Sequence, residues 1–217
     1  MNIEQARFNM IEQQIRPWDV LDTEVLDLLH VVKRENFVPV AHKALAFVDT
    51  EIPLPGGENM LFPKIEARLL QDVNVKKHES VLEIGTGSGY MAALLGYRAR
   101  HVTSIEISPA LKALAEQNLA ANGVTNVTVE LGDGAQGWSA GAPFDVVVVS
   151  GALPELPEAL LKLIMVGGRL AVYIGQAPAM KAQLITRTGE AGYDTRTLFE
   201  TQVKPLLLAN KPSAFKF

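Results

Sequence analysis

The sequence predicts an α/β protein in which helices cover a mostly parallel sheet. From Ser80 onward, short apolar runs alternate with helical patterns, and one of these runs, Val146–Val149, is apolar at every position. A glycine-rich segment joins the first run to the helical pattern that follows it. Alternation of strands and helices is typical of a parallel sheet with helices on both faces. An unbroken apolar run is typical of a strand that is buried on both faces.

The composition is that of an ordinary globular protein. The chain has 217 residues, 48% of them hydrophobic and 20% charged, and a formal net charge of −4. A negative balance does not favour binding to nucleic acid or to anionic membranes. The chain has no Cys, which excludes disulfides and Cys-ligated zinc and suits a reducing compartment. Since neither a signal-peptide core nor an apolar run of roughly 18 residues occurs, we expect a cytoplasmic protein without a membrane anchor.

Helical patterns also occupy much of the N-terminal third. Residues 3–16 and 64–72 are predicted to be helices, and residues 21–32 form an amphipathic helix with Asp22 as its N-cap. The apolar stripe of this helix consists of Leu21, Val25, Leu28, Leu29 and Val32. Between residues 37 and 63, repeated Pro and Gly residues predict a passage of loops.

The elements of the sheet region follow in order. The predicted strands are residues 80–84, 101–105, 127–131, 144–150 and 169–174. The predicted helices are residues 90–98, 109–122 and 157–165. The second of these helices has Ser108 as its N-cap, Pro109 in its first turn and Gly123 after its end. Residues 182–187 and 199–208 are predicted to close the sheet as an antiparallel pair.

The glycine-rich segment, LEIGTGSGY at residues 82–90, has the position of a nucleotide-binding loop, because it follows a strand and opens a helix. Its glycines let the backbone approach a ligand without an intervening Cβ atom. A dinucleotide fingerprint would place Gly at position 90, where this chain has Tyr90. The carboxylate of Glu83 would repel a pyrophosphate, but it suits a cationic ligand that carries an α-amino group and a sulfonium. Glu83 and Tyr90 therefore disfavour a nicotinamide dehydrogenase.

Two further acidic residues stand at the ends of the next strands. Glu106 could accept both ribose hydroxyls of an adenosine, and Asp133, followed by Gly134, could accept from an adenine amino group. Taken alone, either residue could equally be a solvated residue at a strand end. Together they converge with Glu83 at the carboxyl edge of the sheet, where open α/β folds bind ligands. We therefore predict binding of S-adenosyl-L-methionine, with Glu83, Ile84, Gly85, Thr86, Gly87, Ser88, Gly89, Glu106, Ile107, Asp133 and Gly134 as the cofactor-binding residues.

Other polar residues carry weaker signals. The four histidines, His30, His42, His78 and His101, show no metal-ligand spacing, so no metal site is expected. Arg7, Arg16 and Arg34 could bind a carboxylate in bidentate fashion, although a solvated position on the surface is the ordinary expectation for an arginine.

Several motifs resemble those of the protein-L-isoaspartate O-methyltransferase family. They are R-E-N-F-V-P at 34–39, residues 46–55 with D-T-E-I-P-L, the loop at 81–90, residues 126–137 with their Gly-Asp-Gly, and residues 142–149. The resemblance implies a Rossmann-like, seven-stranded S-adenosylmethionine-dependent methyltransferase fold whose last strand runs antiparallel, with an N-terminal helical extension. It implies that residues 1–63 form N-terminal helices and a substrate-cleft loop and that residues 64–217 form the methyltransferase domain, and we expect the two parts to make one structural unit.

The resemblance also implies an activity and a partner. Family members esterify the α-carboxylate of isoaspartyl residues in damaged proteins, the first step of their repair, so a protein or peptide with isoaspartyl residues is the expected substrate. The family usually carries G-Q-T-I-S-Q-P before the cofactor domain, and its Ser and Thr hydroxyls are implicated in the active site. This chain has Leu61 at the Ser position and Asn59 at the Thr position. It also has V-K-P-L at 203–206 in place of F-V-P-L.

These departures leave the acceptor open. Leu61 cannot hydrogen-bond a carboxylate, and Glu58 would repel one if it faced the cleft. Asn59 is the candidate catalytic residue, because it could orient a substrate, although it could equally shape a turn. The alternatives are a methyltransferase of the same fold with a different acceptor and a cofactor-binding module without turnover.

Overall fold

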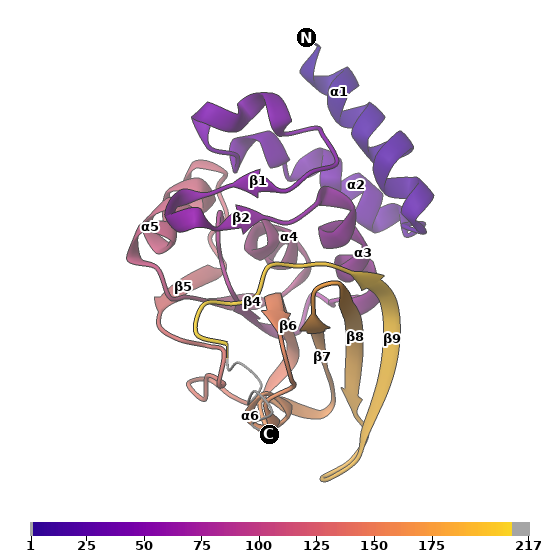
Figure 1. Ribbon diagram of the computed structural model, residues 1–217, viewed down its shortest axis with the longest axis vertical. Coiled ribbons are helices and arrows are strands. Elements are labelled where there is room, and N and C mark those ends of the chain that lie inside the picture. Colours follow the sequence, from indigo (N-terminus) through magenta and orange to yellow (C-terminus); the bar gives the residue numbers. More distant parts are fainter. Residues whose placement is uncertain (1, 210–217) are drawn as a thin grey trace, which may run out of the picture.

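The computed structural model describes residues 2–209 of the chain. Its centre is a seven-stranded sheet of order β5-β4-β3-β6-β7-β8-β9, and a separate two-stranded sheet pairs β1 with β2. The expected seven-stranded, Rossmann-like architecture is confirmed (Figure 1). Residue 1 and residues 210–217, which belong to the two predicted regions 1–63 and 64–217, lie outside the described residues.

The strands at 80–84, 101–106, 127–131 and 144–153 lie close to their predicted positions. The strands are β1 (Ile52–Pro53), β2 (Asn59–Met60), β3 (Ser80–Ile84), β4 (His101–Glu106), β5 (Val127–Leu131), β6 (Phe144–Leu153), β7 (Ile164–Gln176), β8 (Ala179–Arg187) and β9 (Tyr193–Thr201). The α-helices are α1 (Ile3–Met10), α2 (Thr23–Val31), α3 (Pro63–Val73), α4 (Tyr90–Arg98), α5 (Pro109–Ala121) and α6 (Glu158–Leu161). Within residues 2–209, no helix combines the length and the apolar character that crossing a membrane requires.

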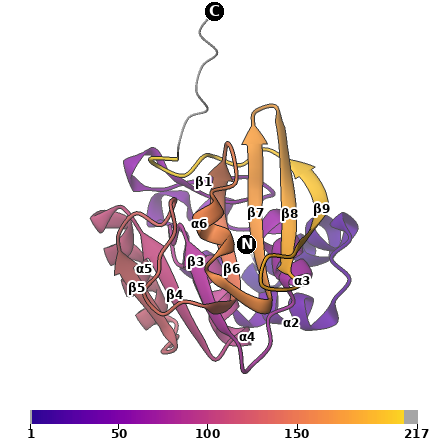
Figure 2. The same cartoon turned by 90° about the horizontal axis from the view of Figure 1, so that it is seen from below.

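The order of the strands creates a crevice at the carboxyl edge of the sheet. The chain runs from β3 outward through β4 to β5, all parallel, and then returns to place β6 on the other side of β3. Neighbouring connections therefore diverge between β3 and β6, and open α/β sheets bind ligands at such a point. Figure 2 shows the strands crossing the molecule from β5 at one edge to β9 at the other.

Three expectations about the second half of the sheet need correction. The strand that opposes the others is β8, which is antiparallel to both β7 and β9, rather than the last strand. The predicted helix at 157–165 is a single turn, because β7 already begins at Ile164, which pairs with Phe144 of β6. The predicted strand at 199–208 is displaced, since β9 ends at Thr201 and Pro205 makes only an isolated bridge to Ala152.

The two faces of the sheet carry separate apolar layers. Val146 and Val148 face the layer that contains α4, α5 and the N-terminal helices, whereas Val147 and Val149 face the layer around α6. This alternation is the period of two expected of a strand that is buried on both sides. Helical cover is unequal, because α2, α3, α4 and α5 belong to the first face and α6 lies on the second.

The N-terminal layer is held by buried ion pairs. Arg7 pairs with Glu35, and Arg34 pairs with Glu66 of α3. Both arginines are only 1% exposed, so the expectation that they are solvated is wrong for Arg7 and Arg34. Arg16, in contrast, is exposed beside Glu12. A buried arginine needs a carboxylate partner, and these partners come from distant parts of the chain.

The helix predicted at 21–32 begins as expected, but its apolar stripe is one residue shorter. The Asp22 side chain accepts from the backbone N–H of Glu24, which confirms the N-cap. Leu21 precedes the cap and is 66% exposed, whereas the other members of the stripe are buried.

Candidate functional site

A cavity of about 80 Å³ lies at the carboxyl ends of β3, β4 and β6. Its walls come from the glycine loop after β3, the end of β4, the Gly-Asp-Gly segment after β5, the bulged end of β6, the β1–β2 hairpin and the segment after β9. The cavity therefore opens where the order of the strands reverses, as the topology predicts.

The glycine loop owes its shape to left-handed backbone positions. Gly85, Gly87 and Gly89 have φ angles of 96°, 55° and 83°, which residues with a Cβ rarely adopt. At Gly89, an added Cβ would also lie 3.3 Å from the backbone of Ala115, so this glycine lets α4 approach α5. Glycine is therefore required in this loop for conformation and close packing together.

Glu106 ties the end of β4 to this loop. One oxygen of its buried carboxylate accepts from the backbone N–H of Gly87, and the other accepts from that of Ser108, both at 2.9 Å. An ionised carboxylate offers about four acceptor positions. Each oxygen can therefore accept a further hydroxyl from a ligand in the cavity.

Glu83 lies behind the loop and is fully buried. Its carboxylate accepts from the hydroxyl of Ser104 at 2.6 Å and from that of Ser150 at 3.0 Å. Ser150 is placed by an irregularity of β6 between Val148 and Ala152, and bulges of this kind re-aim side chains beside functional sites. Desolvation by burial raises the pKa of Glu83 to about 8, since it outweighs the two hydrogen bonds, and the nearby carboxylates of Glu106 and Glu66 also raise it.

Most of the predicted site residues line the cavity. Those in its walls are Ile84, Gly85, Gly87, Glu106, Ile107, Asp133, Gly134 and Asn59. Asp133 is exposed at the rim, and its side chain accepts from the backbone N–H of Ala135. Gly134 packs so closely that an added Cβ would lie 2.8 Å from Ile84.

Four predicted residues support the walls instead of forming them. Glu83, Thr86, Ser88 and Gly89 are absent from the lining of the cavity. The Thr86 hydroxyl is hydrogen-bonded to Ser104 at 2.6 Å, and the carbonyl of Ser88 accepts from Asn118 of α5. Contact of these residues with a ligand stays a prediction.

The β1–β2 hairpin covers the glycine loop from the N-terminal side. Gly56 and Gly57 have positive φ angles, and the N–H of Leu54 donates to the carbonyl of Glu58 at 2.7 Å, which closes the turn. The hairpin places Asn59 and Leu61 in the wall of the cavity. The side chain of Leu61 is buried, and its carbonyl accepts from Arg34 at 2.7 Å.

The segment after β9, which was not among the site residues predicted from the sequence, forms the opposite wall of the cavity. After β9 the chain crosses back over the ends of β8 and β7 to reach β6 (Figure 1). There the N–H of Ala152 donates to the carbonyl of Lys204 at 2.9 Å, and the N–H of Leu206 donates to that of Ala152 at 3.0 Å. The Leu206 side chain packs against Gly85 and Gly151. The departure from F-V-P-L was the one signal in the sequence that marked this segment.

An ion pair joins this segment to the hairpin. The Lys204 ammonium donates to Glu58 Oε1 at 2.8 Å and also to the carbonyl of Gly57. Glu58 therefore faces the cavity with its charge compensated, rather than as the isolated repulsive charge that the sequence suggested.

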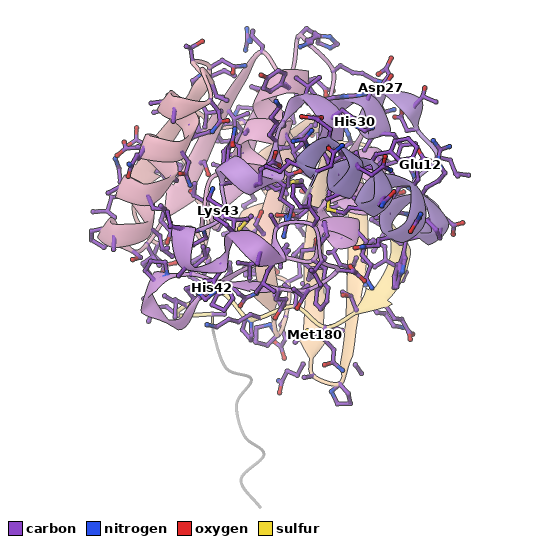
Figure 3. The ribbon with its side chains drawn as sticks, turned by 90° about the horizontal axis from the view of Figure 1, so that it is seen from above. Glu12, Asp27, His30, His42, Lys43 and Met180 are labelled. Carbon is purple, nitrogen blue, oxygen red and sulfur yellow. The ribbon has the colours of Figure 1, made fainter. Side chains whose placement is uncertain are left out.

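A larger cleft of about 1290 Å³ adjoins the cavity. It is lined by the β7–β8 turn, including Met180, by Glu51 and by residues 202–209. The cavity and the cleft share Asn59 and residues 204–207 as a common wall. Figure 3 shows Met180 on the side of the molecule where the β7–β8 hairpin projects.

The histidines lie away from this region. Figure 3 shows His30 on the N-terminal helical layer and His42 on a separate surface turn. Within residues 2–209, no group of three or more His, Cys, Asp or Glu side chains is arranged to hold a metal ion.

Comparison with known proteins adds to this geometry. Residues 5–207 match the family model described as protein-L-isoaspartate(D-aspartate) O-methyltransferase. The chain is 38% identical over 202 residues to a protein-L-isoaspartate O-methyltransferase of Koribacter versatilis, covering 93% of this chain and 90% of that one. It is 37% identical over 207 residues to protein-L-isoaspartate O-methyltransferase 2 of Marinobacter nauticus, covering 95% and 94%.

A solved structure shares the fold. It is a Plasmodium falciparum protein described as a protein-L-isoaspartate O-methyltransferase in complex with S-adenosyl-L-homocysteine. The TM-score is 0.78 over 95% of this chain and 98% of that chain, at 20% sequence identity. At this identity the likeness supports the fold alone.

Proposed function

Because the chain belongs to the protein-L-isoaspartate O-methyltransferase family, we propose that its cavity binds S-adenosyl-L-methionine and that its cleft presents an isoaspartyl carboxylate for methylation. The observation that supports this most is the convergence of the glycine loop and Glu106 on one cavity at the point where the strand order reverses. The cleft beside this cavity has room for a peptide chain.

The residues at the cavity fit this cofactor chemically. Glu106 would hold ribose hydroxyls, since each of its oxygens keeps acceptor capacity after bonding Gly87 and Ser108. Asp133 would accept from an adenine amino group at the rim. The buried carboxyl group of Glu83 behind Gly85 suits a ligand with an ammonium group, which would favour its ionised form.

Methyl transfer to a carboxylate requires little general acid or general base catalysis. When bound, S-adenosylmethionine supplies an electrophilic methyl group on sulfonium. A carboxylate with a pKa near ~4 is already ionised at neutral pH and can act as the nucleophile. The task of the protein is then to position this carboxylate and to exclude water. Asn59, in the wall shared by the cavity and the cleft, would orient the acceptor.

A second candidate is a methyltransferase of the same fold with a different acceptor. Leu61 favours it, because a buried apolar side chain stands where the family has a hydroxyl. Glu51 in the wall of the cleft adds an acidic side chain on the acceptor side. An acceptor without a carboxylate would meet no repulsion there.

An assay with labelled cofactor separates these candidates. The wild-type chain should transfer a base-labile methyl group to an isoaspartyl peptide and not to the matching aspartyl peptide. Leu61→Ser should raise kcat/KM, because it restores a hydroxyl, whereas Leu61→Ala removes the same bulk without a donor and should not. Tight binding of S-adenosylhomocysteine with no methylation of the peptide by wild type or by Leu61→Ser would favour a different acceptor.

Two finer features belong to the same proposal. The lack of Cys suits a reducing, cytoplasmic location, and cell fractionation tests it. Residues 1–63 would shape part of the acceptor side, whereas residues 64–217 would hold the cofactor and supply the rest of the acceptor side. Residues 64–217 expressed alone should be poorly folded, because Glu66 would lose its partner Arg34. A native-like fragment would contradict the view that the two regions form one structural unit.

A further inference from the structure

We propose that Lys204 binds the carboxylate that accepts the methyl group, and so takes the role of the hydroxyl that is missing at position 61. The inference rests on the proposed function, because it assumes that the acceptor is an isoaspartyl carboxylate. It makes Lys204 the residue that determines the specificity of the acceptor side.

The position of Lys204 is the first argument. A substrate side chain that reaches from the cleft toward the cofactor in the cavity must pass the wall that the cavity and the cleft share. This wall consists of Asn59, Lys204, Pro205, Leu206 and Leu207. Among the described residues that line either space, Lys204 carries the one cationic side chain. An anionic acceptor therefore meets one cationic donor, at the place where transfer has to occur.

The hydrogen-bonding capacity of Lys204 is the second argument. An ammonium group has three donors. Glu58 and the carbonyl of Gly57 accept two of them, which leaves the third for an acceptor carboxylate. The same two contacts hold the flexible side chain in place, so little conformational entropy is lost when a substrate binds.

The local charge balance is the third argument. Lys204 and Glu58 form a pair with no net charge, so an incoming carboxylate is not opposed by Glu58 alone. Glu51 lies in the wall of the cleft, where burial raises its pKa, although the hydrogen bond with Asn59 and the charge of Lys204 partly offset this effect. Leu61 offers no competing donor. The carboxylate is thus directed to Lys204.

The test combines variants with two matched peptides. One peptide carries the isoaspartyl carboxylate, and the other carries a carboxamide in its place and serves as a competitive inhibitor. Wild type should bind the acid more tightly than the amide. Lys204→Met should raise the KM for the acid by about 10- to 100-fold, the effect of losing a charged hydrogen bond, and should no longer distinguish acid from amide. Lys204→Arg should restore most of the affinity for the acid and most of the discrimination between acid and amide.

The controls separate binding of the acceptor from a structural effect. Lys77 also donates to a backbone carbonyl, that of Tyr97, but at the opposite edge of the sheet. Lys77→Met should therefore change neither the KM for the acid nor the affinity for the amide. The affinity of Lys204→Met for S-adenosylhomocysteine should match that of wild type. If Lys204→Met methylates the acid with an unchanged KM and still distinguishes acid from amide, this inference is wrong but the proposed function stands. Failure of wild type to methylate the acid would overturn the proposed function, and the inference with it.

Discussion

Glu106 and Gly87 are joined by a hydrogen bond of 2.9 Å between the carboxylate at the end of β4 and a backbone N–H in the loop after β3. This bond locks the glycine loop against the neighbouring strand before any ligand arrives. In the proposed function the same carboxylate holds a ribose, so loop geometry and ligand binding would depend on one side chain.

Glu106→Gln should weaken binding of S-adenosylhomocysteine by about 10- to 100-fold, because an amide accepts at one atom and leaves a backbone N–H unpaired. Isothermal titration calorimetry measures the change. Glu116→Gln, on the exposed side of α5, is the matched control and should bind like wild type. Equal affinity in both variants would show that Glu106 does not hold the ligand.

The affinity for a cationic cofactor should rise with pH. Burial raises the pKa of Glu83 to about 8 in the free protein, so Glu83 is mostly neutral at pH 7. A ligand ammonium favours the carboxylate, and binding then releases a proton. Between pH 6.5 and 8 the affinity should rise by up to about tenfold per pH unit. Calorimetry in buffers of different ionisation enthalpy measures this proton release, and Glu83→Gln should abolish it.

Folding stability should fall as the pH rises from about 4.5 to 8. Burial raises the pKa of Glu66 to about 7 and that of Glu83 to about 8, from 4.5. In this range the folded protein holds protons that the unfolded chain has released, so deprotonation favours unfolding. Glu79 and Asp145, whose pKa values are lowered, act in the opposite direction and only at more acidic pH.

Urea unfolding at pH 6 and at pH 8.5 measures this effect. The wild-type free energy of unfolding should drop by on the order of 3 kcal/mol, and Glu83→Gln should reduce the drop. A free energy that is flat or rising over this range would contradict the raised pKa values.

Arg34→Met should lower the free energy of unfolding by about 3–5 kcal/mol, because it leaves Glu66 buried without its partner. The loss also removes the donor to the Leu61 carbonyl and the contact of the guanidinium with the Tyr90 ring, 5.1 Å from its centroid. Arg16→Met removes an exposed pair with Glu12 and should change stability by less than about 1 kcal/mol. Equal effects of the two variants in urea unfolding would show that burial of Arg34 does not matter.

Local signals predicted the elements that local chemistry determines. The strand at 80–84 and the helix at 90–98 were found to the residue, because the glycine loop marks the boundary between them. The helix expected at 157–165 failed because its second half pairs with β6, a contact that no local pattern encodes. The burial of Arg34 likewise depends on Glu66, which lies far along the chain.

The candidate site likewise contains residues that the sequence could predict and residues that it could not. The glycine loop, Glu106 and the Gly-Asp-Gly segment could be predicted because each lies at the carboxyl end of a strand of a parallel sheet. Lys204 and Leu206 could not, because they reach the cavity by a return of the chain across β8 and β7 to β6. Sequence spacing carries no information about such a return.

That return sets the order in which the site can be assembled during synthesis. Residues 203–206 follow every strand of the sheet in the chain, from β3 to β9. Synthesis proceeds from the N-terminus, so the cofactor loop leaves the ribosome before the wall that carries Lys204. A chain that stopped after β9 would have every strand of the sheet but lack the cation on the acceptor side. The ability to hold an acceptor would be acquired last.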